Sequence, residues 1–136
     1  MRVAILWASA KRASAGAETA RSLVRGMEAM GHQVDLIDAW TGDGTRLPAY
    51  GYVAVIAEQT GLFGGVMPES LARTLGAGRG LVGKKGAAFL KKTGPFTGRA
   101  LANLMRAMER EGMVVNWSDI ILSASHAEAL GKRIGT

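Results

Sequence analysis

Three short segments carry most of the residues that could do chemistry, and each follows an apolar run. The first, residues 8–16, places the hydroxyls of Ser9 and Ser14 beside the cations of Lys11 and Arg12. Hydroxyls, cations and the free N–H groups of a helix start are what a phosphate group needs. The same composition equally fits a loop that is simply solvated. The candidate phosphate ligands are Ser9, Lys11, Arg12, Ser14, Ala15 and Gly16.

The second segment, residues 58–65, lies between an apolar run at 52–57 and a predicted helix. It combines three glycines with the large apolar residues Leu62 and Phe63. A loop of this kind can lie close to a flat ligand and present apolar side chains to it. Alternatively, Phe63 plugs the end of the core. The candidate ring contacts are Thr60, Gly61, Leu62, Phe63 and Gly64.

The third segment, residues 91–98, follows an apolar run at 86–90 and precedes another predicted helix. Its glycines permit a close approach of backbone to a ligand edge. Lysines in such a segment more often face solvent than take part in chemistry. Phe96 could equally serve as a hydrophobic staple that packs against the helix that follows. The candidate contacts here are Lys92, Thr93, Gly94, Phe96 and Gly98.

The elements that position these segments alternate between strand and helix along the whole chain. Helical apolar spacing recurs within 20–30, 71–75 (including Ala72) and 100–108, and Ser125 with Glu128 forms a capping box for a last helix reaching about Ile134. Residues 41–51 are expected to form a loop. The predicted strands are 3–7, 34–37, 52–57, 86–90, and 113–115 with 120–122, the last with a bulge or bend at 116–118.

This alternation predicts a single α/β domain over residues 1–136, with helices on both faces of a doubly wound, five-stranded parallel sheet. The strand order is expected to be 2-1-3-4-5, with the more polar second strand near an edge. The switch point then lies between the first and third strands. All three candidate segments would therefore meet at the carboxyl ends of the strands.

Composition excludes several kinds of site. The chain has no cysteine, so disulfides, thiolate metal sites and a cysteine nucleophile are ruled out. Its two histidines, His32 and His126, are too few for a histidine-rich metal site and are expected at the surface. The net charge of +6 is scattered and the aromatic content is only 6%, which argues against specific nucleic-acid binding. No apolar run is long enough to span a membrane, and a cytoplasmic location is expected.

Taken together, the segments resemble the flavodoxin-like flavoprotein superfamily. In loop style they are most similar to NAD(P)H-dependent FMN reductases and small flavodoxin-domain proteins. Residues 9–16 occupy the place of the family's phosphate loop, S-P-R-x-x-G-N-T. Residues 60–68 are similar to its third-strand loop, T-P-x-Y-x-G-x-x-P, and residues 83–89 resemble its fourth-strand region. The likeness covers nearly the whole chain.

The chain also departs from the family pattern. Its first loop has Ala10 in place of the proline and Ser14 in place of a glycine. The Ser-Pro that often ends the third strand is replaced by Glu58 and Gln59, and Glu58 would add a negative charge near a cofactor. The family's aromatic pair is reduced to Phe63, helped by Phe96. Family members are commonly acidic, whereas this chain is basic.

The resemblance implies FMN, bound without a covalent link at the carboxyl edge of the sheet. Its phosphate would lie on residues 9–16 and its ring between the second and third segments. Since reduced FMN is anionic, Lys91 and Lys92 are expected to raise its redox potential.

Three kinds of function remain open. The first is electron transfer with a redox partner protein, and the second is an FMN-dependent NAD(P)H oxidoreductase acting on flavins or quinones. The third is an interaction domain that kept the fold and lost the flavin. The chain is expected to be a monomer or a homodimer, and Trp40 is the one tryptophan expected to make a surface contact.

Overall fold

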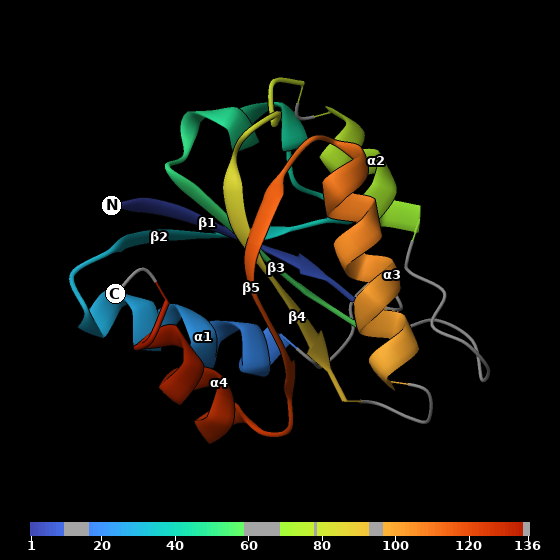
Figure 1. Cartoon of the computed structure of the whole chain (residues 1–136). Coiled ribbons are helices and arrows are strands. Elements are labelled where there is room, and N and C mark those ends of the chain that lie inside the picture. Colours follow the sequence, from blue (N-terminus) through green and yellow to red (C-terminus); the bar gives the residue numbers. More distant parts are fainter. Residues whose placement is uncertain (10–16, 59–68, 78, 93–96, 135–136) are drawn as a thin grey trace.

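The computed structural model describes residues 1–9, 17–58, 69–77, 79–92 and 97–134. Its centre is a five-stranded sheet in the order β2-β1-β3-β4-β5, in which every pair is parallel (Figure 1). This confirms the predicted strand order. The strands are β1 (Arg2–Ala8), β2 (Gln33–Asp38), β3 (Tyr52–Ala57), β4 (Lys85–Lys91) and β5 (Val114–Ile121).

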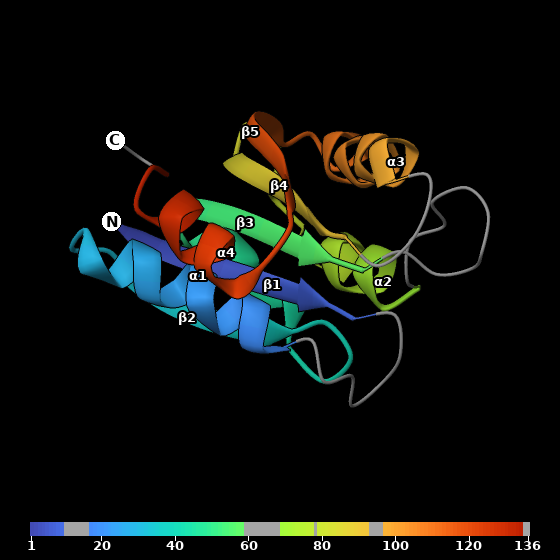
Figure 2. The ribbon, with the colours of Figure 1, turned by 90° about the horizontal axis from the view of Figure 1, so that it is seen from below.

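Helices cover both faces of the sheet (Figure 2). One face packs against α1 (Ala17–Ala29) and α4 (Ala124–Gly131). The other packs against α2 (Glu69–Ala77), α3 (Thr97–Arg110) and the short 3₁₀ helix η1 (Gly44–Ala49). The predicted doubly wound architecture is therefore confirmed for the described residues.

The three central strands are buried on both sides. In β1, for example, Ile5 faces the core under α1 and α4, while Leu6 faces the core under α2 and α3. Both side chains have no exposed surface. A parallel strand covered by helices on both faces needs apolar residues at consecutive positions, which explains the uninterrupted apolar runs.

The edge strands differ from the central ones. Strand β2 is largely exposed, as its polar sequence predicted. In β5 the register jumps, because Gly86 faces Val115 and Ala87 faces Trp117, so that Asn116 is an extra residue. This confirms the predicted bulge. The Tyr52 hydroxyl donates to Asn116 Oδ1 at 2.7 Å, and burial raises the pKa of Tyr52 to about 12.

Several local predictions are wrong. Residues 41–51 contain the 3₁₀ helix η1, because Asp43 caps it by accepting the N–H of Thr45 at 3.0 Å. The cap of α4 is Ser123, which accepts the N–H of His126 at 3.1 Å, and not Ser125. Helix α4 also ends at Gly131, short of the predicted Ile134.

Three side chains have a different exposure from the one predicted from the sequence. Ala72 is exposed rather than part of the core. His32 and His126 are half-buried rather than fully at the surface, and His126 Nδ1 accepts the N–H of Leu122 at 3.1 Å.

Helices α1 and α4 pack closely against each other at two glycine residues, one in each helix. A Cβ added to Gly26 would lie 2.1 Å from the Glu128 carbonyl oxygen, and one added to Gly131 would lie 2.5 Å from the Leu23 carbonyl oxygen. Neither distance can be accommodated without moving a helix. Helix α1 carries the chain away from the first candidate segment, so this contact fixes the helix that follows that segment.

We expect Gly26→Ala to lower the free energy of unfolding by ~1–3 kcal/mol, because the added methyl group meets backbone rather than a movable side chain. Urea denaturation of the apoprotein measures this. The matched control is Gly76→Ala in α2, where a Cβ would meet only Glu111 Oε1 at 3.8 Å, and higher helix propensity should stabilise by up to ~1 kcal/mol. Equal effects of the two variants would contradict the close packing.

Candidate functional site

Strands β1, β3 and β4 end side by side. Ala8 and Ala57, the last residues of β1 and β3, are paired with each other, and Ala57 is paired with Leu90, one residue before the end of β4. The N–H of Glu58 donates to the Ala8 carbonyl at 3.0 Å. The three candidate segments therefore leave the sheet at one edge, which we call the carboxyl edge. The first residues beyond the strands are Ser9, Glu58 and Lys92.

Three of the predicted site residues lie within the described residues. Ser9 is buried at the end of β1, and Lys92 is exposed just beyond β4. Gly98 lies in the first turn of α3, where an added Cβ would meet nothing within 4 Å. The others lie outside the described residues: Lys11, Arg12, Ser14, Ala15, Gly16, Thr60, Gly61, Leu62, Phe63, Gly64, Thr93, Gly94 and Phe96.

Helices also begin at the carboxyl edge. Helix α1 starts at Ala17, directly after the first segment, and α3 starts at Thr97, so that the last two residues of the third segment already belong to this helix (Figure 2). The first N–H groups of a helix have no partner within it, and the helix dipole gives this end a partial positive charge. This arrangement favours an anion near the helix starts.

A carboxylate and an ammonium group meet at the same edge. Lys91 Nζ lies 3.7 Å from Glu58 Oε2, and the side chains of Lys91 and Glu58 are 29% and 10% exposed. The sequence predicted that Glu58 would bring a negative charge to this region. The carboxylate does lie at this edge, where Lys91 offsets its charge, while Lys92 has no ion pair within the described residues.

Trp40 has a role that the sequence did not indicate. The surface contact expected of Trp40 stays a prediction, and in addition its half-buried indole donates its Nε1–H to the Ser9 carbonyl at 3.1 Å. The contact joins the residue after β2 to the residue after β1, 31 positions apart. The spacing of apolar residues along the sequence does not indicate a hydrogen bond of this kind.

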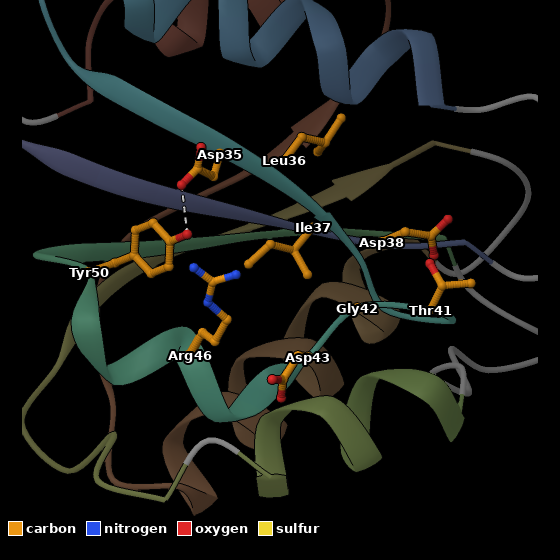
Figure 3. Close-up of a pocket in the computed structure, with 9 residues that line it drawn as sticks. All are labelled: Asp35, Leu36, Ile37, Asp38, Thr41, Gly42, Asp43, Arg46 and Tyr50. Carbon is orange, nitrogen blue, oxygen red and sulfur yellow. Dashed lines mark hydrogen bonds between the residues drawn. The ribbon is translucent and has the colours of Figure 1, made fainter.

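A groove of about 610 Å³ runs along the free edge of β2, beside η1 (Figure 3). Within it, the Tyr50 hydroxyl donates to Asp35 Oδ2 at 2.7 Å, and this hydrogen bond raises the pKa of Tyr50. Figure 3 shows the guanidinium of Arg46 between Tyr50 and Ile37. The groove was not predicted, because residues 41–51 were expected to form a plain loop. Its lining is Asp35, Leu36, Ile37, Asp38, Thr41, Gly42, Asp43, Arg46 and Tyr50.

Carboxylates surround the groove, which therefore does not suit a phosphate group. Asp35, Asp38 and Asp43 line it, against the single cation of Arg46. Fixed negative charge on three sides opposes an anionic ligand. The carboxyl edge, with its helix starts and lysines, is the better place for one.

Other kinds of site find no support in the part of the chain that the structure describes. There, no group of three or more histidine and carboxylate side chains could hold a metal ion. None of the helices traced in the described ranges is both long and apolar enough to cross a membrane.

Comparison with known proteins defines the fold. No family model matches the sequence, and no curated protein sequence matches it either. Solved structures do match: oxidised flavodoxin 1 from Bacillus cereus has a TM-score of 0.72 at 16% identity, covering 96% of this chain and 95% of that one. A flavodoxin from the domain Archaea has a TM-score of 0.73 at 20% identity, covering 98% and 96%.

The flavodiiron protein from Giardia intestinalis has a TM-score of 0.76 at 18% identity, and here the match covers 98% of this chain but 35% of that one. The chain thus has the flavodoxin-like fold, as the resemblance implied. At sequence identities of 16% to 20%, the similarity to these structures establishes the fold alone.

We expect Lys91→Met to lower the free energy of unfolding by ~1–3 kcal/mol, because it leaves the buried Glu58 carboxylate without this partner. Adding Glu58→Gln should recover part of the loss. Lys92→Met is the matched control and should stay within ~0.5 kcal/mol of wild type, since Lys92 is exposed and has no described ion pair. Urea denaturation measures all variants. Equal losses for the two lysine variants would contradict the pairing.

Proposed function

We propose that the protein is an FMN-binding redox protein that transfers electrons through a flavin held without a covalent link. The observation that carries the proposal is the convergence of β1, β3 and β4 at one edge of a sheet with flavodoxin-like strand order. Open α/β sheets bind ligands at this place. Similar solved structures include an oxidised and a two-electron reduced flavodoxin, which supports a redox role.

The chemistry of the described residues fits FMN. A phosphate dianion is matched by the helix start of α1 and by the Ser9 hydroxyl at the end of β1. No atom of the described residues lies within 4 Å of a Cβ added at Gly98, so none of them would obstruct a ligand beside the start of α3. Among the described carboxylates at this edge, Glu58 is offset by Lys91, and Glu18 is exposed in the first turn of α1.

Each candidate segment then has a defined task. Residues 9–16 would hold the phosphate, with Ser9, Lys11, Arg12 and Ser14 as the donors from side chains. Residues 60–64 and 92–98 would lie on either side of the ring. FMN supplies the electron-accepting and electron-donating chemistry when bound, while the chain binds it, orients it and sets its electrostatic surroundings. The electron partner would be a redox protein or NAD(P)H.

Flavin content tests the proposal directly. The protein is purified, incubated with excess FMN and separated from free flavin, and bound flavin is measured by absorbance. We expect about one FMN per chain. A colourless protein after incubation would contradict the proposal and favour a flavin-free interaction domain. Rapid oxidation of NAD(P)H by the loaded protein would identify a reductase rather than an electron carrier.

We expect Lys11→Glu with Arg12→Glu to weaken FMN binding by at least about tenfold, since two charge-assisted contacts become repulsive. Fluorescence titration of the apoprotein measures the affinity. Arg79→Glu with Lys85→Glu is the matched control, because it makes the same change in net charge at two exposed residues on the amino-terminal side of β4. Equal weakening by both pairs would remove the first segment from the site.

Replacing Lys91 and Lys92 by glutamate should lower the midpoint potential of the bound flavin by tens of millivolts, because negative charge disfavours the anionic reduced form. The two replacements change four unit charges, and each of these, acting over about 10 Å, contributes ~0.4 kcal/mol at an effective dielectric constant of about 80. Redox titration measures the shift, with the Arg79/Lys85 pair again as control. An unchanged midpoint would show that the third segment lies away from the ring.

A further inference from the structure

The corner formed by Ala39 and Trp40, just after β2, is bonded to the end of β1. The N–H of Ala39 donates to the Trp7 carbonyl at 2.8 Å, which continues the ladder between β1 and β2. One residue on, Trp40 Nε1 donates to the Ser9 carbonyl at 3.1 Å. Ser9 is the residue at which the candidate phosphate segment begins. The corner therefore fixes the peptide unit that opens this segment.

The same corner is bonded to α2, which follows the second candidate segment. Thr74 Oγ1 lies 2.9 Å from the Ala39 carbonyl oxygen and is buried there. The Arg73 guanidinium donates to the carbonyls of Ala39 and Trp40, each at 3.1 Å. Donors from α2 thus hold the corner from one side while the indole of Trp40 reaches the end of β1 on the other.

The turn itself is tight, which limits how the indole can move. The N–H of Trp40 donates to Asp38 Oδ1 at 2.9 Å, and the N–H of Gly42 donates to the Asp38 carbonyl at 2.6 Å. A Cβ on Gly42 would meet that carbonyl oxygen at 2.6 Å, so the turn needs glycine at this position. The backbone around Trp40 is therefore held by its own contacts before any ligand is considered.

We propose that Trp40 is a positioning residue for the phosphate group of the flavin nucleotide, acting through the carbonyl of Ser9. This rests on the proposed function, since it concerns how the same site holds its ligand. Trp40 does not bind the phosphate. Its indole N–H fixes the carbonyl of Ser9, the described residue at which that segment begins, before the ligand arrives.

A purely structural role for Trp40 makes a different prediction. Loss of general packing at the corner would weaken any ligand that binds at the carboxyl edge, with or without a phosphate. Loss of orientation in the phosphate segment would weaken only the ligand that carries a phosphate. FMN and riboflavin share the same ring and differ by this group, so the pair separates the two roles.

The experiment is a titration of the apoprotein with FMN and with riboflavin, for wild type and Trp40→Phe. The ratio of the riboflavin Kd to the FMN Kd reports the contribution of the phosphate. We expect Trp40→Phe to reduce this ratio about three- to tenfold, the usual effect of one hydrogen bond, while the riboflavin Kd changes by less than about twofold. Trp117→Phe is the matched control, since the buried Nε1 of Trp117 has no hydrogen-bond partner among the described residues.

An unchanged ratio in Trp40→Phe would overturn the proposal, even if both ligands bound more weakly. Should that variant fold poorly, replacement of Trp40 by β-(3-benzothienyl)alanine removes only the N–H and keeps the shape of the ring, and the same reduction in ratio is expected. A wild-type protein that binds neither ligand would overturn the proposed function, and the role of Trp40 with it. Wild-type binding with an unaltered ratio in the variants would overturn the role of Trp40 alone.

Discussion

Burial of β1, β3 and β4 on both faces is the constraint on which the rest of the structure depends. Consecutive residues such as Ile5 and Leu6 belong to opposite cores, so helices must cover both sides of the sheet. Parallel strands joined through helices leave the sheet at one edge and return at the other. The three candidate segments therefore all begin where β1, β3 and β4 end.

The charges at the carboxyl edge differ from those in the groove beside β2. Helix starts and Lys92 favour an anion at the carboxyl edge, and Lys91 offsets the buried Glu58. The groove beside β2 instead carries three carboxylates against one guanidinium. A phosphorylated ligand is therefore expected at the carboxyl edge and not in the groove beside β2.

The sequence predicted the sheet well because apolar runs report burial directly. The run 52–57 matches the bounds of β3, and Gly31 and Gly112, which adopt φ angles of 88° and 83°, lie just past the ends of α1 and α3. The predictions that were wrong depend on contacts that the spacing of apolar residues does not encode. Ser123 and Ser125 are equally good caps by type, and only the geometry of the turn decides between them.

The candidate site was predictable to a smaller extent. The placement of its segments follows from strand order, and the first residues after the strands lie where that order predicts. Two features could not be foreseen from residue types alone: the pairing of Glu58 with Lys91, and the bond from Trp40 to Ser9. Both join residues 31 or more positions apart, and both depend on how the ends of neighbouring strands align.

The most direct measurement is the mapping of FMN onto the ¹⁵N-labelled apoprotein by amide chemical shifts. The account predicts that perturbed amides cluster at the ends of β1, β3 and β4, including Ser9, Glu58 and Lys92, and at the first turns of α1 and α3. Perturbations confined to the groove between Asp35 and Tyr50, or spread evenly over the surface, would contradict it.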